Sequence, residues 1–227
     1  MHNKCDLLIK LDTNVERVIL LRHFESIKNI NNIHGGSGDV LTVFGREQAM
    51  QIHDQLTYFE INHSTTSIFH SNSVQTKESA QLIAGYFGLK TCETSLLSSI
   101  NLGKLNGISD AVASENFPQE YELMKQWRKR KIEVDSLISI GMESPAVFWN
   151  RGIAFLSSLN YFNNIVICST STMILLLHIL SGNSYLPGHG YYSIPIKNAQ
   201  IVSFCFSEGK PRLDSKKTDK ELLEYLL

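Results

Sequence analysis

Residues 18–26 read VILLRHFES, an apolar run followed at once by a basic pair. The apolar residues predict a buried strand. Open α/β sheets bind ligands at the carboxyl ends of their strands, where a guanidinium and an imidazole can meet an oxyanion away from bulk water. Arg22 and His23 therefore indicate a phosphate or other anion site. The alternative is an exposed basic pair at a strand end.

The length and composition of the chain are those of one globular domain. It has 227 residues, of which 43% are hydrophobic and 19% charged, enough for a sizeable core. A formal net charge of -1 gives no overall attraction to nucleic acid or to an anionic membrane. We expect a single domain over residues 1–227 whose partner is a small molecule, with neither nucleic acid nor a membrane as a partner.

The cysteines and the N-terminal residues indicate the compartment. Four cysteines lie far apart, without the paired spacing of zinc sites or small disulfide frameworks: Cys5, Cys92, Cys168 and Cys205. Free thiols are therefore expected. The N-terminus carries charges and no long apolar stretch, which is typical of neither a signal peptide nor a membrane span. We expect a cytoplasmic protein that uses no metal and no cofactor.

Short apolar runs alternate with amphipathic patterns along the chain, which favours helices that cover a largely parallel sheet. The expected strands are residues 18–21, 67–70, 164–168 and 201–206. Helices are expected after a start signal near Thr42, up to a stop at Gly88, and over residues 146–159 and 173–180. His178, inside the last helix, is expected to be a hydrogen-bonded core histidine.

Two polar regions are harder to place. Residues 98–141 lack clear strands and predict a helical insertion or cap within the domain. A basic run inside it, residues 127–131, is expected to form a solvated helix face. The highly charged tail after Lys210 is expected to be mobile.

Six segments follow one another in the order of one family's motifs. They are LRHFES (21–26) with Asn29, LTVFGREQA (41–49), SNSVQTKESA (71–80), LGKLNG (102–107), GMES (141–144) and IVICS (165–169). Together they resemble the histidine phosphatase superfamily, the phosphoglycerate mutase-like proteins, from about Val18 to Phe206. The resemblance implies a three-layer α/β sandwich with a largely parallel central sheet flanked by helices.

The resemblance also implies a reaction. In that family a neutral imidazole attacks phosphorus, two arginines and a second histidine neutralise the phosphate oxygens, and a carboxylic acid protonates the leaving oxygen. Carried over to this chain, His23 is the nucleophile and Arg22 the first arginine of the phosphate clamp. Ser26 and Asn29 match positions that help to hold the phosphate.

Several positions of the family's pattern carry other residues here. Gln75 stands where the second arginine belongs, Ser99 where an acidic residue follows leucine, and Ser169 where the second histidine belongs. These side chains still form hydrogen bonds, so we predict that they bind a less charged ligand. Phe24, in place of a glycine, predicts a narrowed or reshaped site.

Losing an oxyanion donor costs on the order of 10²–10³ in rate, and losing a general acid on the order of 10²–10⁴. Other side chains could replace the missing groups. The candidate histidines are His34, His70 and His189, and the candidate proton donors are Asp110 and Glu115. For each of them the alternative is an ordinary surface, turn or solvated position.

These residues lead to three hypotheses. We expect a divergent family member that binds a phosphorylated or otherwise anionic small molecule at Arg22 and His23, with weak or altered phosphomonoesterase or phosphotransferase activity through His23. The first alternative is an inactive pseudoenzyme that binds a metabolite or a protein partner. The second is a repurposed hydrolase, in which Ser169 or His23 carries out non-phosphoryl chemistry. Association into a homo-oligomer stays open.

Overall fold

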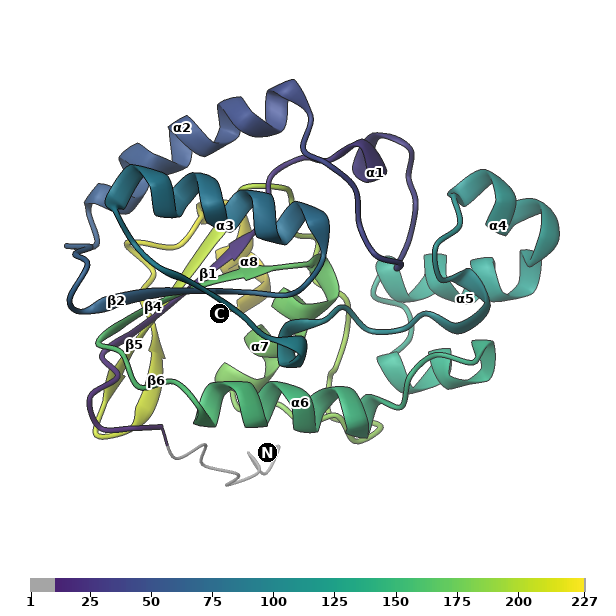
Figure 1. Cartoon of the computed structure of the whole chain (residues 1–227). Coiled ribbons are helices and arrows are strands. Elements are labelled where there is room, and N and C mark those ends of the chain that lie inside the picture. Colours follow the sequence, from purple (N-terminus) through teal and green to yellow (C-terminus); the bar gives the residue numbers. More distant parts are fainter. Residues whose placement is uncertain (1–10, 227) are drawn as a thin grey trace.

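The computed structural model describes residues 11–226 and shows helices on both faces of a six-stranded sheet (Figure 1). The strand order is β3-β2-β4-β1-β5-β6. The strands are β1 (Arg17–Arg22), β2 (Thr66–His70), β3 (Thr91–Glu93), β4 (Asn163–Cys168), β5 (Ile201–Ser207) and β6 (Lys210–Leu213). Strands β1 to β4 pair in parallel, whereas β5 and β6 are antiparallel to their neighbours. The predicted fold class is confirmed.

Strand β1 lies inside the sheet, between β4 and β5. Val18 and Leu20 enter one core cluster, and Ile19 and Leu21 enter the other. All four side chains are fully buried. An uninterrupted apolar run is typical of a strand that is covered on both faces. The carboxyl end of β1, with Arg22, therefore opens at the middle of the sheet edge, where α/β proteins bind ligands.

The two core clusters place the main helices. Helices α2 (Val43–Thr57) and α3 (Val74–Phe87) supply apolar residues to one cluster. Helices α6 (Pro145–Ser157) and α7 (Thr170–Leu180) supply them to the other. Figure 1 shows these two pairs on opposite sides of the sheet. Each of the predicted helical stretches thus forms a helix against the sheet.

Local signals set the ends of α2 and α3. The Thr42 hydroxyl accepts a hydrogen bond from the Gly45 amide at 2.9 Å, and α3 ends at Gly88 with a φ of 63°. The predicted start and stop are confirmed. Gly45 also allows α2 to begin against the loop that follows His23. A Cβ at this position would lie 2.1 Å from the Glu25 carbonyl oxygen.

Residues 95–140 form short helices and turns at one end of the sheet (Figure 1). The helices are η1 (Ser95–Leu97), η2 (Gly103–Leu105), α4 (Asp110–Asn116), α5 (Pro118–Arg128) and η3 (Val134–Ile140), and a short α1 (Ile27–Ile30) follows His23. We call residues 98–141 the cap. Its status as an insertion within a single domain stays a prediction.

The predicted mobility of the tail after Lys210 was wrong. Strand β6 pairs with β5, and helix α8 (Lys220–Leu226) follows it. Leu222 is fully buried, and the Asp214 carboxylate binds Arg17 at 2.9 Å. The high charge of this tail suggested mobility, but strand β6 and the buried Leu222 hold the tail on the sheet.

Among residues 11–226, no helix is long and apolar enough to cross a membrane. Cys92, Cys168 and Cys205 are free thiols. Cys5 and the charged residues before Leu11, on which part of the expected compartment depended, lie outside the described residues.

Candidate active site

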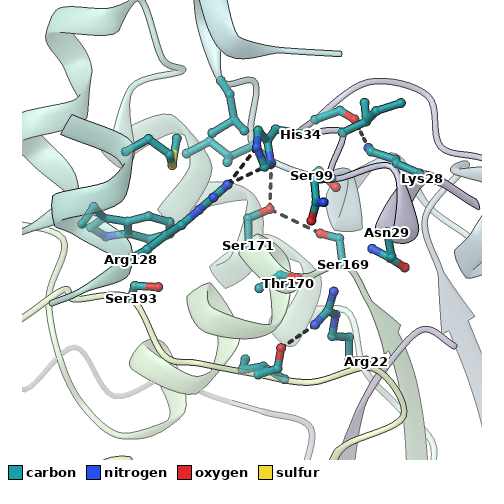
Figure 2. A pocket seen from close by; sticks show the side chains of 18 of the residues that line it. Arg22, Lys28, Asn29, His34, Ser99, Arg128, Ser169, Thr170, Ser171 and Ser193 are labelled. Carbon is teal, nitrogen blue, oxygen red and sulfur yellow. Dashed lines mark hydrogen bonds between the residues drawn. The ribbon is translucent and has the colours of Figure 1, made fainter. Parts of the chain in front are cut away.

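Arg22 and His23 lie where β1 ends, and both line a cavity of about 620 Å³. Figure 2 shows Arg22 among the side chains of this cavity. The His23 amide donates to the Cys168 carbonyl of β4 at 3.0 Å, so the pair is fixed to the neighbouring strand. The cavity opens between the sheet edge and the cap. Its volume falls within the range of about 300–1,000 Å³ that is usual for small-molecule sites.

The His23 imidazole is neutral and presents one free ring nitrogen. Only 3% of the residue is exposed, and its Nδ1 lies 2.7 Å from the Phe24 carbonyl oxygen. Because a carbonyl only accepts hydrogen bonds, this contact assigns the proton to Nδ1 and leaves the lone pair on Nε2. Burial, followed by the charge of Arg22, lowers the pKa of His23 to about 3. The ring therefore has the form that a nucleophile needs at neutral pH.

The Arg22 guanidinium is a buried cation with one unused donor. Its Nη1 donates to the Ile196 carbonyl. Its Nε is buried without a hydrogen-bond partner among the described residues. Burial lowers the pKa of Arg22 to about 10, so the side chain remains charged at neutral pH. Arg22 therefore brings a positive charge to the lining of the cavity beside His23, with one N–H group that has no protein partner among the described residues.

Ser26 and Asn29 form a support for this pair. The Asn29 Oδ1 accepts from the Ser26 hydroxyl at 3.0 Å and from Asn198 Nδ2 at 3.2 Å. Asn198 also donates to the His23 carbonyl at 2.9 Å. Asn29 lines the cavity, whereas Ser26 is fully buried outside its lining. Ser26 therefore contributes by orienting Asn29, and sequence reasoning missed Asn198 because it lies far along the chain.

Gln75, Ser99 and Ser169 all line the same cavity. The Gln75 Oε1 accepts from the Asp39 amide at 3.1 Å, so this side chain holds the loop before α2. Ser169 caps α7 by accepting from the Thr172 amide at 3.3 Å. The three positions thus add neutral hydrogen-bonding groups to the cavity that Arg22 also lines.

Within the described part of the chain, no base lies within hydrogen-bond distance of the Ser169 hydroxyl. Its hydroxyl contacts the hydroxyls of Thr172 at 2.9 Å and Ser171 at 3.3 Å. Neither of these partners can remove its proton at neutral pH. The arrangement gives no support to a serine hydrolase mechanism in this cavity.

A second basic group lies in the cavity wall. The His34 Nε2 donates to the Asp110 carboxylate at 2.5 Å, and its Nδ1 accepts from Arg128 at 2.8 Å. Lys28 also lines the cavity. The basic run 127–131 was expected to be solvated, but Arg128 lies at the end of α5 and reaches the cavity. In the view of Figure 2, Arg22 and Arg128 lie on opposite sides of Ser171.

His34 and Asp110 are the candidate base and acid in this group, and the pKa values of both are lowered. Burial, reinforced by the charge of Arg128, lowers the pKa of His34 despite its bond to Asp110. Burial alone would raise the pKa of Asp110, but its contacts with His34 and Arg128 lower it overall. Asp110 is therefore a carboxylate at neutral pH and holds no proton for a leaving group.

The remaining candidates lie outside the cavity lining. His70 is buried with its Nδ1 2.7 Å from the Ser71 carbonyl oxygen, and Glu115 and His189 are exposed. His178 is a core histidine, as expected: its Nε2 donates to the Tyr192 carbonyl at 2.8 Å. Phe24, expected to narrow the site, instead packs fully buried in the core beneath α2 and α3.

Comparison with known proteins agrees with this fold. Alpha-ribazole phosphatase from Shigella flexneri is 18% identical with a TM-score of 0.67, over 87% of this chain and 94% of that chain. A mycobacterial glucosyl-3-phosphoglycerate phosphatase is 17% identical with a TM-score of 0.69, over 88% and 97%. YhfR of Bacillus stearothermophilus is 16% identical with a TM-score of 0.70, over 91% and 98%.

At these identities the solved structures show a shared fold. Curated proteins gave no match. A family model described as the histidine phosphatase superfamily (branch 1) matches residues 18–219, most of the chain. The chain therefore belongs to the histidine phosphatase superfamily, branch 1.

Proposed function

We propose that this protein binds a phosphorylated small molecule at Arg22 and transfers its phosphoryl group to His23, at a low rate. One observation carries the proposal: a neutral imidazole with a free Nε2 lies beside a buried guanidinium with an unused N–H, at the wall of one cavity. The Nε2 lone pair would form the P–N bond while the P–O ester bond breaks. Water would then hydrolyse the phosphohistidine.

The low rate follows from the groups around this pair. Gln75 and Ser169 are neutral, so the cavity has no charged side chain at these two positions, and Arg22 is the charge with the larger effect on His23. Two carboxyl side chains line the cavity among residues 11–226. Asp110 is ionised against His34 and Arg128, and Glu25 accepts from the Thr42 hydroxyl at 2.9 Å. Alkoxide leaving groups need a proton that neither carboxyl is placed to give.

A trapped phosphoenzyme tests the proposal. An aryl phosphate is the suitable probe, because a nitrophenolate leaving group departs without a proton. After incubation with 4-nitrophenyl phosphate and quenching at neutral or alkaline pH, which preserves the acid-labile P–N bond, mass spectrometry should find one added phosphoryl group on His23. His23→Ala should lose the label. His189→Ala, which changes an exposed histidine outside the cavity, should keep it.

Absence of label and of turnover from the wild-type chain would overturn the catalytic proposal. The second candidate function would then apply, a pseudoenzyme that binds a phosphorylated metabolite without reacting. The observation that favours it is that the lining of the same cavity carries the neutral side chains Gln75, Ser99 and Ser169. Binding of a non-hydrolysable phosphonate by the wild-type chain, with no label, would support that function. The cytoplasmic location remains part of our proposal, on the ground of the unpaired cysteine spacing.

A further inference from the structure

The peptide group that joins His23 to Phe24 is held from both sides by side chains. The His23 carbonyl accepts from Asn198 Nδ2 at 2.9 Å, and the Phe24 amide donates to the Ser79 hydroxyl at 3.1 Å. Asn198 lies just before β5, and Ser79 lies in α3. Strand β1 ends at Arg22, so this peptide group belongs to no strand. Its orientation is therefore fixed by two distant segments of the chain.

The Ser79 hydroxyl is committed to this contact. Its side chain is fully buried, and its proton donates to the Gln75 carbonyl at 2.7 Å. A hydroxyl has a single proton, so its oxygen is left to accept from the Phe24 amide. Phe24 is fully buried as well. A rotation of the peptide group would leave a buried N–H without a partner, which is unfavourable.

Asn198 directs both protons of its amide nitrogen to this region. One partner is the His23 carbonyl, and the other is Asn29 Oδ1 at 3.2 Å. The same Asn29 oxygen accepts from the Ser26 amide at 3.0 Å, so it is the oxygen and not the nitrogen of Asn29 that faces Asn198. Both partners of Asn198 Nδ2 are therefore pure acceptors. Asn198 thus joins the backbone of His23 to the side chain of Asn29.

The held peptide group determines which nitrogen of the His23 ring carries the proton. The ring Nδ1 lies 2.7 Å from the carbonyl oxygen of Phe24, the residue whose amide Ser79 fixes. The hydrogen bond of one ring nitrogen decides the protonation of the other. If the peptide group rotated, the Phe24 carbonyl would leave Nδ1. The proton could then move to Nε2, and the lone pair that attacks phosphorus would be lost.

We propose that Asn198 and Ser79 are positioning residues, which clamp the His23–Phe24 peptide group and thereby keep the Nε2 lone pair of His23 free. This inference rests on the proposed function for the role of His23 as the nucleophile. It adds the two side chains that prepare this nucleophile through its backbone. Their loss should act on kcat more than on KM, because it changes the geometry of attack and leaves the Arg22 charge in place.

Nitrogen NMR of the histidine rings tests the clamp without turnover. In a long-range ¹H–¹⁵N spectrum at pH 7.5, the wild-type His23 ring should have a protonated Nδ1 and an unprotonated Nε2. Comparison with His23→Gln assigns the signals. In Asn198→Ala the form protonated on Nε2 should appear and become the major one. Ser79→Ala should give the same change and serves as the second variant if Asn198→Ala does not fold. An unchanged His23 ring in both variants would overturn the inference.

Steady-state kinetics with 4-nitrophenyl phosphate separate positioning from a general loss of structure. Asn198→Ala should lower kcat about tenfold or more and change KM by less than about threefold, with rates corrected for the folded fraction. Gln200→Ala is the matched control. The Gln200 Oε1 accepts from the Lys197 amide at 2.7 Å in the same turn, but its side chain forms no hydrogen bond with His23 or Asn29 in the described structure. Its kcat should stay within about threefold of wild type.

The two possible failures are distinguishable. Equal losses of kcat in Asn198→Ala and Gln200→Ala would mean that the reaction needs only an intact turn, and the inference would be wrong. Absence of turnover from the wild-type chain would overturn the proposed function alone, because the ring spectrum reports on the clamp separately.

Discussion

Ser169 occupies the place where the family's pattern has a second histidine, and its side chain lines the cavity that contains Arg22. Ser169→His should raise kcat/KM for 4-nitrophenyl phosphate at least tenfold, because a positioned donor to the transferring phosphoryl group is worth on the order of 10²–10³ in rate. The change also removes the α7 cap, which should cost about 1 kcal/mol. Initial rates and the free energy of unfolding check the two effects.

Ser169→Ala is the control for this prediction. It loses the cap in the same way, since the hydroxyl no longer accepts from the Thr172 amide, but it adds no donor. Its stability should match that of the histidine variant, and its rate should stay near wild type. Equal rates for the two variants would mean that the missing imidazole does not limit the reaction.

Residue by residue, the sequence located Arg22 and His23 better than the side chains around them. Arg22 and His23 are adjacent in the chain and follow an apolar run, so one strand assignment locates both. Asn198 donates to the His23 carbonyl, and the Ile196 carbonyl accepts from Arg22, although both lie about 175 residues further along the chain. No local sequence pattern indicates such a contact. Arg128 was missed because its helical run is polar on several sides, so periodicity could not show which face meets the cavity.

Among the elements, the cap depends on a close approach of two backbone segments. Gly103 of η2 has a φ of 59°, and a Cβ there would lie 2.4 Å from the Gly141 carbonyl group. Gly103→Ala should lower the free energy of unfolding by roughly 2–4 kcal/mol, because left-handed strain adds to a backbone clash that no side-chain rotation relieves. Urea unfolding, followed by far-UV circular dichroism, measures the loss.

Gly107 provides the matched position for this test. Its φ is 80°, and a Cβ there would meet nothing within 4 Å. Gly107→Ala should therefore lose only the strain contribution, about 1 kcal/mol. Similar losses at the two glycines would show that the contact with Gly141 does not hold the cap in place.

The elements that the sequence revealed are those with a simple apolar pattern. The core covers strands β1, β2, β4 and β5 and the helices beside them. Their buried positions therefore form a clear apolar pattern in the sequence. Strand β6 and helix α8 lie at the border of the sheet, where one or two buried side chains are enough to hold a charged segment. Their composition therefore resembled that of a mobile tail.

For the whole molecule, the buried histidines predict how stability depends on pH. The pKa values of His23 and His178 are lowered, mainly by burial, to about 3 and about 4. The unfolded chain binds protons at these residues near pH 6.5, whereas the folded chain does not. Stability should therefore be constant above about pH 7 and fall as the pH decreases through this window, by about 2 kcal/mol per histidine at pH 5.

Urea unfolding at pH 7.5, 6 and 5 measures this dependence. His23→Gln removes one of the two groups, so its stability should fall about 2 kcal/mol less than that of wild type between pH 7.5 and 5. The comparison uses the change of the free energy of unfolding with pH. A general loss of stability in the variant therefore does not affect it. Identical slopes for the two chains would show that His23 titrates normally in the folded state.

The central position of β1 has a consequence for biosynthesis. Its neighbours β4 and β5 begin at Asn163 and Ile201, and Asn198 completes the support of His23. The ribosome therefore synthesises Arg22 and His23 early and their partners in β4, in β5 and at Asn198 much later. Nascent chains shorter than about 200 residues lack β5, one of the two neighbours of the apolar strand β1. Chaperone occupancy should therefore persist until β5 has been synthesised.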